Sequence, residues 1–477
     1  MADAAERLPT VAGTFYPDNP TVLQNMINNH LDAVGQLPDI DGRIVAIIVP
    51  HAGLVYSGKI AAHAYKLLEG QDIQTAVICG PSHRYRFSGV SVYGPDVTWK
   101  TPLGDVSCNR ERCLNLLNYD GHIKEIPEAH LQEHCLEVQL PYLQTVLDDF
   151  KLVPVLMGYP DRKTIELLAD ALTAIEPDDK TIMIASTDWQ HYRPASAGWV
   201  MDSLGIDCLM RYDAKRLTEL LDDGKVEMCG GGATVAIMKA AKARGADRIR
   251  ILKYGDSGDM SGDKSSVVGY VAAVIYASGE NSAPKESKRI EKPDRPPLYE
   301  LNEKEKNELL TIARTSISTY LETGHPAEFR AEGKLAEPGA AFVTLTKQEQ
   351  LRGCIGHVAA VAPLYQTVAT CAVQAAVADR RFPPVSAAEL SQLHLEISVL
   401  TPMQKVDDIN TIEVGRDGLM IERGNNRGLL LPQVATDYGW NRTQFLEQTC
   451  RKAGLPTDAY RSPDAVIYRF QALVFGE

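Results

Sequence analysis

The chain has 477 residues, of which 44% are hydrophobic and 23% are charged, as in an ordinary globular protein. At about 150 residues per domain, this length predicts roughly three domains or two of unequal size. The 62 acidic residues outnumber the 49 basic residues, and the net charge of −13 disfavours bulk binding to nucleic acid or to an anionic membrane.

The N-terminus and the cysteines both favour a cytoplasmic protein. The first ten residues, MADAAERLPT, carry charges where a signal peptide has an apolar run. The longest apolar stretch, residues 267–277, is about half as long as a segment that crosses a bilayer. The nine cysteines include no C-x-x-C pair, which fits a reducing compartment and argues against a zinc ribbon.

One change of composition divides the chain. Residues 278–297 are polar, charged and rich in proline, and we interpret them as a linker. The alternative is a surface loop within one domain. We therefore predict a first domain at residues 1–277 and a second at residues 298–477.

The first segment alternates between β-branched apolar runs and amphipathic helices. Strands are predicted at residues 43–50, 75–83, 151–158, 181–189, 248–258 and 265–277, and helices at residues 58–70, 136–147, 164–175 and 233–245. The alternation predicts an α/β fold with a largely parallel sheet that helices cover on both faces. In such sheets the working site lies beyond the carboxyl ends of the strands.

Four of these strands end at histidine or aspartate residues. In chain order they are followed by His51, by His83, by Asp188 and His191, and by Asp256 and Asp259. A lone histidine at a strand end is more often structural, but four such ends in one sheet favour a shared site.

Two histidines and one carboxylate form the ligand set of a non-haem Fe(II) centre, which leaves positions open for dioxygen and a bidentate substrate. The same ligand types also suit Zn, Mn and Cu, and an open zinc site would favour hydrolysis instead. From the strand ends alone, the third ligand stays open between Asp188, Asp256, Asp259 and Asp263.

A second cluster of polar residues lies in E-A-H-L-Q-E-H-C-L-E-V-Q-L-P-Y. If the predicted helix begins early enough, His130 and His134 share one face, as do Glu133 and Glu137. The functional interpretation is a set of groups that orient metal ligands or substrate. The alternative is a polar helix start with glutamates near its positive end.

The glycine run C-G-G-G-A-T at residues 229–234 precedes a predicted helix. Its free backbone N–H groups are an anion site in principle. We favour the alternative, a turn that allows tight helix packing, because the run matches neither a Walker nor a Rossmann pattern.

The second segment mixes helices and strands as an α+β domain does. Helices are predicted at residues 303–322, 363–378 and 442–454, and strands at residues 340–347, 394–400, 418–423, 428–433 and 465–475. Cys354, three residues before His357, is a candidate nucleophile, with a small buried side chain as the alternative. Arg352, Arg380 and Arg381 are candidates for binding an anionic substrate, with structural ion pairs as the alternative.

Several motifs of the first segment closely resemble the Memo family. They are V-A-G-T-F-Y-P, P-H-A-G-L-V-Y-S-G, G-P-S-H, T-P-L-G-D-V, E-H-C-L-E-V-Q-L-P-Y and S-T-D-W-Q-H-Y, and the resemblance covers about residues 7–277. Memo proteins resemble class III extradiol dioxygenases in fold, whose Fe(II) is held by two histidines and one carboxylate. The resemblance implies that His51 and His83 bind the metal, that His191 is the acid–base catalyst and that His134 is a second pocket histidine. The third ligand position, a cysteine in the animal pattern, falls on Asp259 when it is counted back from Ser265.

The second segment resembles the AMMECR family through L-R-G-C-I-G-H, A-D-R-R-F-P-P-V and E-I-S-V-L-T-P, across about residues 300–475. The combination resembles the prokaryotic Memo–AMMECR fusion, which often occurs with a radical-SAM protein. We therefore expect such a protein as a partner. The sequence leaves the oligomeric state open.

The leading hypothesis is an Fe(II)-dependent dioxygenase of the extradiol type that acts with O2 on a catechol-like or enediol-like small molecule. His51, His83 and Asp259 are expected to hold the metal, His191 and His134 to act in catalysis, and Tyr56, Glu133, Asp188, Cys354 and Arg352 to contact substrate or support ligands. The AMMECR-like domain is expected to cap or assist the site. The alternatives are a Zn- or Mn-dependent hydrolase on the same residues and a non-catalytic metal-binding or interaction module.

Overall fold

The computed structural model describes residues 5–35, 37–38, 40–174, 179–278, 300–348, 350–358, 360–379, 381–424 and 426–477. The chain separates into two compact units, Met1–Gly279 and Glu280–Glu477. Of the predicted linker, only Ser278 is described, as the last residue of a strand, and the rest lies outside the described residues.

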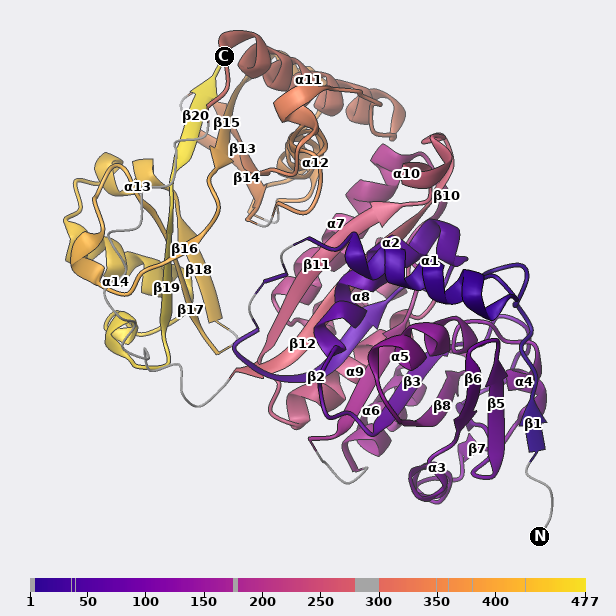
Figure 1. Ribbon diagram of the computed structural model, residues 1–477. Coiled ribbons are helices and arrows are strands. Elements are labelled where there is room, and N and C mark those ends of the chain that lie inside the picture. Colours follow the sequence, from indigo (N-terminus) through magenta and orange to yellow (C-terminus); the bar gives the residue numbers. More distant parts are fainter. Residues whose placement is uncertain are drawn as a thin grey trace. The chain divides into compact units, whose positions relative to one another are not determined.

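A nine-stranded sheet forms the centre of the first unit (Figure 1). Its order is β10-β12-β2-β9-β3-β8-β4-β7, and β11 also pairs with β12. The strands are β2 (Gly42–Val49), β3 (Thr75–Pro81), β4 (Val90–Val92), β7 (Ile123–Lys124), β8 (Lys151–Met157), β9 (Thr181–Ser186), β10 (His191–Arg193), β11 (Arg248–Asp256) and β12 (Val267–Ser278). The four central strands β2, β9, β3 and β8 are parallel, which confirms the predicted largely parallel sheet.

The carboxyl ends of these strands meet at one edge of the sheet. β2, β9, β3 and β8 run in the same direction. β11 has the same direction, because it is antiparallel to β12 and β12 is antiparallel to β2. This edge therefore carries the residues that follow each strand.

Helices cover both faces of the sheet because its central strands are mostly apolar and buried. All residues of β9 are buried, and so are Val45–Val49 of β2. α2 (Leu54–Tyr65) packs on β2, β11 and β12, while α9 (Gly231–Ala243) packs on β2, β3 and β9 on the other face (Figure 1). The remaining helices of this unit are α1 (Pro20–Asp32), α3 (Arg110–Leu117), α4 (Pro127–Leu131), α5 (Leu140–Val146), α6 (Arg162–Ala174), α7 (Ala195–Met210), α8 (Ala214–Asp222) and α10 (Gly258–Ser261).

The N-terminal strand is fixed to the rest of the unit by a buried ion pair. β1 (Ala5–Arg7) pairs in parallel with β5 (Val97–Thr101), which forms a small sheet with β6 (Gly104–Ser107). The guanidinium of Arg7 binds the carboxylate of Glu137, and both side chains are fully buried. Glu137 also accepts hydrogen bonds from the backbone of Thr10 and Val11.

The second unit contains two antiparallel four-stranded sheets, ordered β14-β13-β15-β20 and β16-β19-β17-β18. Their strands are β13 (Ala340–Lys347), β14 (Gln350–His357), β15 (Leu393–Leu400), β16 (Gln404–Lys405), β17 (Gly418–Arg423), β18 (Asn426–Leu430), β19 (Val466–Phe470) and β20 (Ala472–Gly476). The helices are α11 (Glu303–Thr323), α12 (Leu364–Val377), α13 (Pro432–Asp437) and α14 (Arg442–Lys452). The single strand predicted at residues 465–475 is wrong: the chain is interrupted at Gln471, so that β19 and β20 belong to different sheets.

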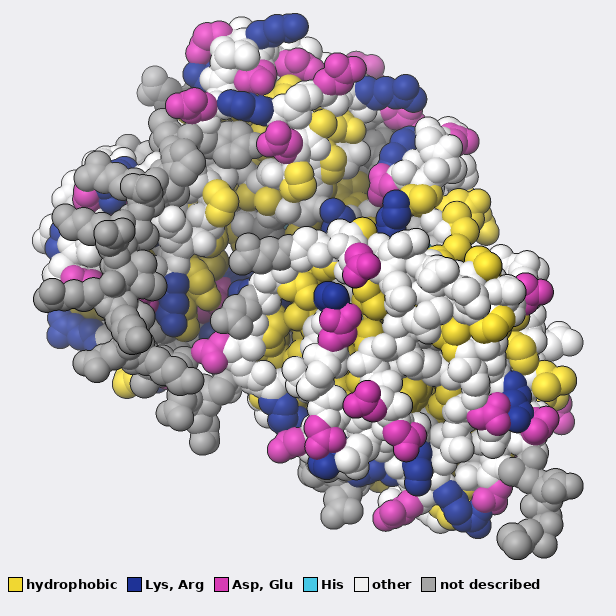
Figure 2. All heavy atoms as spheres, viewed as in Figure 1, with side chains coloured by type: hydrophobic (Ala, Val, Ile, Leu, Met, Phe, Trp, Pro, Cys, Tyr) yellow, Lys and Arg dark blue, Asp and Glu magenta, His cyan; other side chains and the backbone are white. Residues whose placement is uncertain are grey.

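The surface of the first unit shows acidic and basic side chains interspersed on the face drawn in Figure 2. Within the described parts of the chain, no helix combines the length and the apolar character that a membrane crossing requires. All nine cysteines are free thiols.

Candidate metal centre

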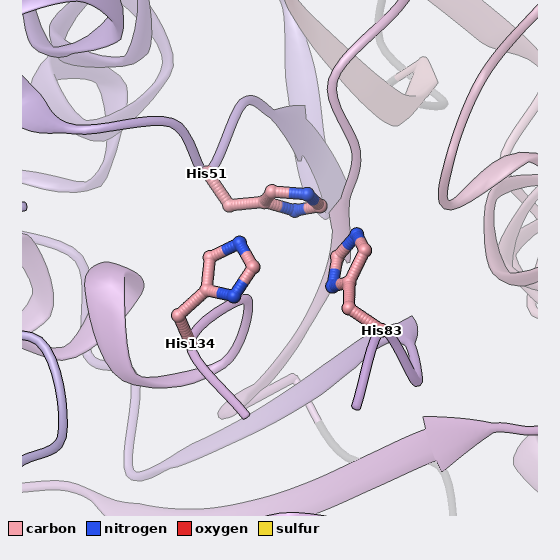
Figure 3. Close-up of side chains that lie close together, drawn as sticks. All are labelled: His51, His83 and His134. Carbon is pink, nitrogen blue, oxygen red and sulfur yellow. The ribbon is translucent and has the colours of Figure 1, made fainter. Parts of the chain in front are cut away.

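Three imidazole rings converge at the carboxyl edge of the central sheet (Figure 3). His51 follows β2, His83 follows β3, and His134 lies in the loop after α4. One ring nitrogen from each lies within 4.8 Å of those of the other two. The ring centroids are 5.2 Å apart for His51 and His83, 5.4 Å for His51 and His134, and 4.6 Å for His83 and His134.

Glu133 orients two of these rings. Its Oε1 atom lies 2.9 Å from Nδ1 of His83 and 3.2 Å from Nδ1 of His134. Burial alone would raise the pKa of Glu133, but hydrogen bonds from His134 and His83 and their charges hold this pKa below its ordinary value. The carboxylate therefore accepts at both Nδ1 atoms and leaves each Nε2 atom free for another partner.

The tautomer of His51 is fixed by Ser186. The hydroxyl of Ser186 donates its single proton to the backbone oxygen of Cys135, at 2.7 Å. Nδ1 of His51 lies 3.0 Å from that hydroxyl oxygen and must therefore donate to it. Burial, followed by the charges of His83 and His134, holds the pKa of His51 well below its ordinary value. The ring is thus neutral, and Nε2 carries the lone pair.

This donor set fits a transition metal. Metal-binding imidazoles characteristically donate their second ring nitrogen to a carboxylate or another oxygen, as all three rings do here. Neutral imidazole nitrogens suit Zn, Cu, Fe and Ni. The three Nε2 atoms of His51, His83 and His134 are the atoms that would bind the ion.

The structure does not bring Asp259 to these rings. Asp259 lies on α10, where one carboxylate oxygen forms an ion pair with Lys264 at 2.5 Å and the other accepts a hydrogen bond from the backbone N–H of Asp256. The group within 4.8 Å contains His134 as its third member and not Asp259. The set of two imidazoles and the Asp259 carboxylate stays a prediction, and in this structure Lys264 holds that carboxylate.

Three other predicted residues of the first unit lie outside this group of rings. Asp188 is buried after β9 and accepts a hydrogen bond from the backbone N–H of His51 at 2.7 Å, so that it fixes the loop that carries this ring. His191 begins β10, and its Nδ1 lies 3.7 Å from a carboxylate oxygen of Glu227. Tyr56 lies on α2 with an exposed side chain.

Sequence reasoning missed Cys229. Its sulfur lies 3.1 Å from Nε2 of His51 and accepts a hydrogen bond from the backbone N–H of Asp188 at 3.2 Å. The glycines that follow allow this close approach, since a Cβ atom on Gly230 would lie 2.3 Å from the backbone oxygen of Ser186. Cys229 does not follow a strand, so the strand-end rule could not predict that it lies beside His51.

The predicted helix does not begin early enough to hold both His130 and His134. α4 ends at Leu131, and residues 137–139 form a 3-10 turn before α5. His130 instead bonds to the hydroxyl of Ser91 through Nε2. From this segment, His134 belongs to the group of three rings, and Glu133 and Cys135 form a second group with His83.

Comparison with known proteins agrees with the geometry. Residues 7–274 match the family model described as Memo-like protein, and residues 310–475 match AMMECR1. The chain belongs to the Memo-like family.

The relatives of this Memo-like chain include archaeal proteins. A MEMO1 family protein of Methanopyrus kandleri is 40% identical over 284 residues, which cover 57% of this chain and 100% of the relative. A MEMO1 family protein of Methanocaldococcus jannaschii is 37% identical over 285 residues, which cover 56% of this chain and 98% of the relative. A solved structure of an uncharacterized protein from Pyrococcus horikoshii is 41% identical with a TM-score of 0.35, and the match covers 36% of this chain and 90% of that chain.

In the AMMECR1 unit the predicted residues are held by structural contacts. Arg352 forms an ion pair with Glu389, at 3.2 Å. Arg381 binds Asp379, which also accepts a hydrogen bond from the backbone N–H of Cys354. Burial raises the pKa of the Cys354 thiol, so the structure favours a packed side chain over an activated nucleophile. Arg380 lies outside the described residues.

Proposed function

We propose that the Memo-like unit is a mononuclear metal enzyme whose ion is held by Nε2 of His51, His83 and His134. The observation that carries this proposal is the arrangement of the Nδ1 atoms. Each of them faces an oxygen of Glu133 or Ser186, so that all three rings are oriented before any ion binds.

For the reaction, we propose an Fe(II)-dependent, extradiol-type oxidation of a small molecule that binds through two oxygens. The support is the resemblance of Memo proteins to class III extradiol dioxygenases, together with a ligand set that leaves coordination positions for substrate. When bound, the metal would supply a site at which substrate and dioxygen come together. O2 and a diol are thus the proposed substrates.

His191 is the proposed acid–base group of this reaction. Its Nδ1 lies 3.7 Å from a carboxylate oxygen of Glu227, and its side chain is partly exposed, as an acid–base group that meets substrate must be. At Nε2 it would take a proton from a substrate hydroxyl and later return it. In this scheme His134 is a ligand and not a second acid–base catalyst, because its ring is held by the same carboxylate as His83.

The test is anaerobic loading of the full chain with Fe(II), followed by oxygen uptake with a series of catechols. We expect one equivalent of iron in the wild type, clear loss of iron in His51→Ala, and retained iron with reduced oxygen uptake in His191→Asn. Equal iron retention in wild type and His51→Ala would overturn the proposal.

A zinc-dependent hydrolase is the second candidate, and the replacement of a carboxylate by a third histidine favours it. Three histidines and one open position form the ligand set of some catalytic zinc sites. Metal analysis of protein purified without oxygen, and ester hydrolysis by the zinc-loaded form, distinguish the two candidates. The capping role of the AMMECR1 unit and the partnership with a radical-SAM protein stay predictions.

A further inference from the structure

Two cysteines lie near the start of α3, at the amino edge of the central sheet. Cys108 forms an isolated bridge with Leu152, near the beginning of β8. The side-chain amide of the next residue, Asn109, donates to the hydroxyl of Thr75, the first residue of β3, at 3.0 Å. His83 follows the other end of that strand. These cysteines are therefore remote from the proposed metal site.

Cys108 and Cys113 occupy the two positions of a hydrophobic staple. Asn109 caps α3, because its side chain accepts a hydrogen bond from the backbone N–H of Arg112. Cys108 is the residue before this cap, and Cys113 is the fourth residue of the helix. Side chains at these two positions pack against each other across the start of a helix. The cap thus brings two thiols together.

The two thiols are in contact and almost fully enclosed. A hydrogen bond between them, followed by burial, raises the pKa of Cys108. Cys113 is fully buried, whereas Cys108 is 7% exposed. Both are free thiols in this structure. Cys108 is therefore the sulfur that a small reagent in solvent meets first, and Cys113 is its covered neighbour.

We propose that Cys108 and Cys113 are a modification site at which peroxide forms a reversible disulfide across the start of α3. The sulfur of Cys108 attacks hydrogen peroxide, the O–O bond breaks, and Cys108 becomes a sulfenic acid as one water leaves. The sulfur of Cys113 then forms the S–S bond and displaces the sulfenic oxygen, which leaves as a second water. Two thiols are oxidised and one peroxide is reduced, and a dithiol reductant reverses the reaction.

The disulfide would act as a covalent lock on one edge of the sheet. α3 packs against β4, β7 and β8. The reduced staple holds the start of α3 by packing alone, so the helix can open locally, whereas a covalent bond prevents this opening. Oxidation should therefore slow the local unfolding of α3. The inference is independent of the proposed metal site.

The test treats the metal-free full chain with hydrogen peroxide in the presence of a chelator. The remaining thiols are blocked with N-ethylmaleimide in denaturant, and the chain is digested with trypsin. Trypsin cleaves after Arg110 and Arg112, so the two cysteines fall on separate peptides, residues 101–110 and 113–124. We expect mass spectrometry to find these peptides joined in the oxidised wild type and separate after dithiothreitol.

Variants test the order of the two steps. Cys113→Ser should lose the joined peptides and leave Cys108 as a sulfenic acid that dimedone traps, whereas Cys108→Ser should lose both products. Cys208→Ser, which removes a buried thiol of α7, should match the wild type. Because the thiolate is the nucleophile and its pKa is raised, the rate of joining should increase about tenfold per pH unit above neutrality.

Hydrogen exchange tests the lock itself. We expect the amides of α3 to exchange more slowly in the oxidised wild type and to recover their original rate after reduction. Absence of the joined peptides, or a disulfide between other cysteines in their place, would overturn the inference. Joined peptides with unchanged exchange in α3 would overturn the lock. Neither result tests the proposed metal site, because these samples contain no metal.

Discussion

Glu133 binds His83 through both of its carboxylate oxygens. Oε2 accepts the backbone N–H of His83 at 2.6 Å, and Oε1 lies 2.9 Å from its ring Nδ1. One buried carboxylate thus fixes both the main chain and the ring of a proposed ligand. The same Oε1 atom also reaches His134, so the orientation of two rings depends on a single side chain.

Replacement of Glu133 should weaken metal binding more than it weakens the fold. In Glu133→Gln the amide nitrogen cannot accept a hydrogen bond, so at least one N–H group at His83 or His134 loses its acceptor. We expect the dissociation constant for Zn²⁺ to rise about 10- to 100-fold, measured by competition with a chromogenic chelator. Glu128→Gln, on the exposed face of α4, is the control. Unchanged affinity in Glu133→Gln would show that this carboxylate does not orient the ligands.

Asp259 should be dispensable for metal binding. Its carboxylate is held by Lys264 and by the backbone N–H of Asp256. We expect Asp259→Asn to retain one equivalent of metal by elemental analysis, whereas His83→Ala loses it. Loss of metal in Asp259→Asn would instead restore the ligand set of two histidines and one carboxylate.

His130 should make the first unit less stable in acid. Burial, followed by the charge of Arg7, lowers the pKa of His130 to about 3. In the unfolded chain this histidine takes up a proton below about pH 6.5, but in the folded chain it does so only near pH 3. Its contribution to stability is therefore present above pH 6.5 and is lost as the pH falls through this window, at on the order of 1 kcal/mol per pH unit.

Urea unfolding of the wild type and of His130→Gln between pH 7 and pH 4 measures this effect. We expect the free energy of unfolding of the first unit to fall less steeply in the variant. Burial also lowers the pKa values of His51 and His30. The free energy of unfolding of the variant should therefore still fall somewhat as the pH decreases. Identical slopes in the two proteins would exclude His130 as a source of acid sensitivity.

Cys354 should react slowly with alkylating reagents. Burial raises the pKa of its thiol, so that the reactive thiolate is scarce at neutral pH. We expect iodoacetamide to modify Cys354 in the folded protein at least about tenfold more slowly than in the urea-unfolded chain, as followed by peptide mass spectrometry. Rapid modification at neutral pH would revive the hypothesis of a nucleophile in the AMMECR1 unit.

The sequence was sufficient to predict the central sheet and two of the three imidazoles. β2 and β9 are short and entirely apolar over their central residues, which is the pattern of strands buried on both faces. His51 and His83 follow such strands directly, so that the strand-end rule places them at the same edge.

The rest of the site depends on contacts that sequence patterns do not contain. The position of Asp259 in the sequence placed it near the carboxyl edge of the sheet. It did not reveal that Lys264 forms an ion pair with its carboxylate. No helix extends through His134, because the carboxylate of Glu133 accepts the backbone N–H groups of His134 and Cys135, which holds the chain in a loop. Cys229 reaches His51 across 178 residues of sequence, and only tertiary packing produces that contact.

The ion pair between Arg7 and Glu137 has a consequence for biosynthesis. This ion pair holds the start of the chain against the segment that carries Glu133 and His134. The contacts of His51 with Ser186 and Cys229 form only after those later residues have been synthesised. About half of the polypeptide must therefore leave the ribosome before all contacts of the three imidazoles can form. Insertion of the proposed ion would follow translation of this region, and nascent fragments that stop before Ser186 would carry the three histidines without the residue that fixes the tautomer of His51.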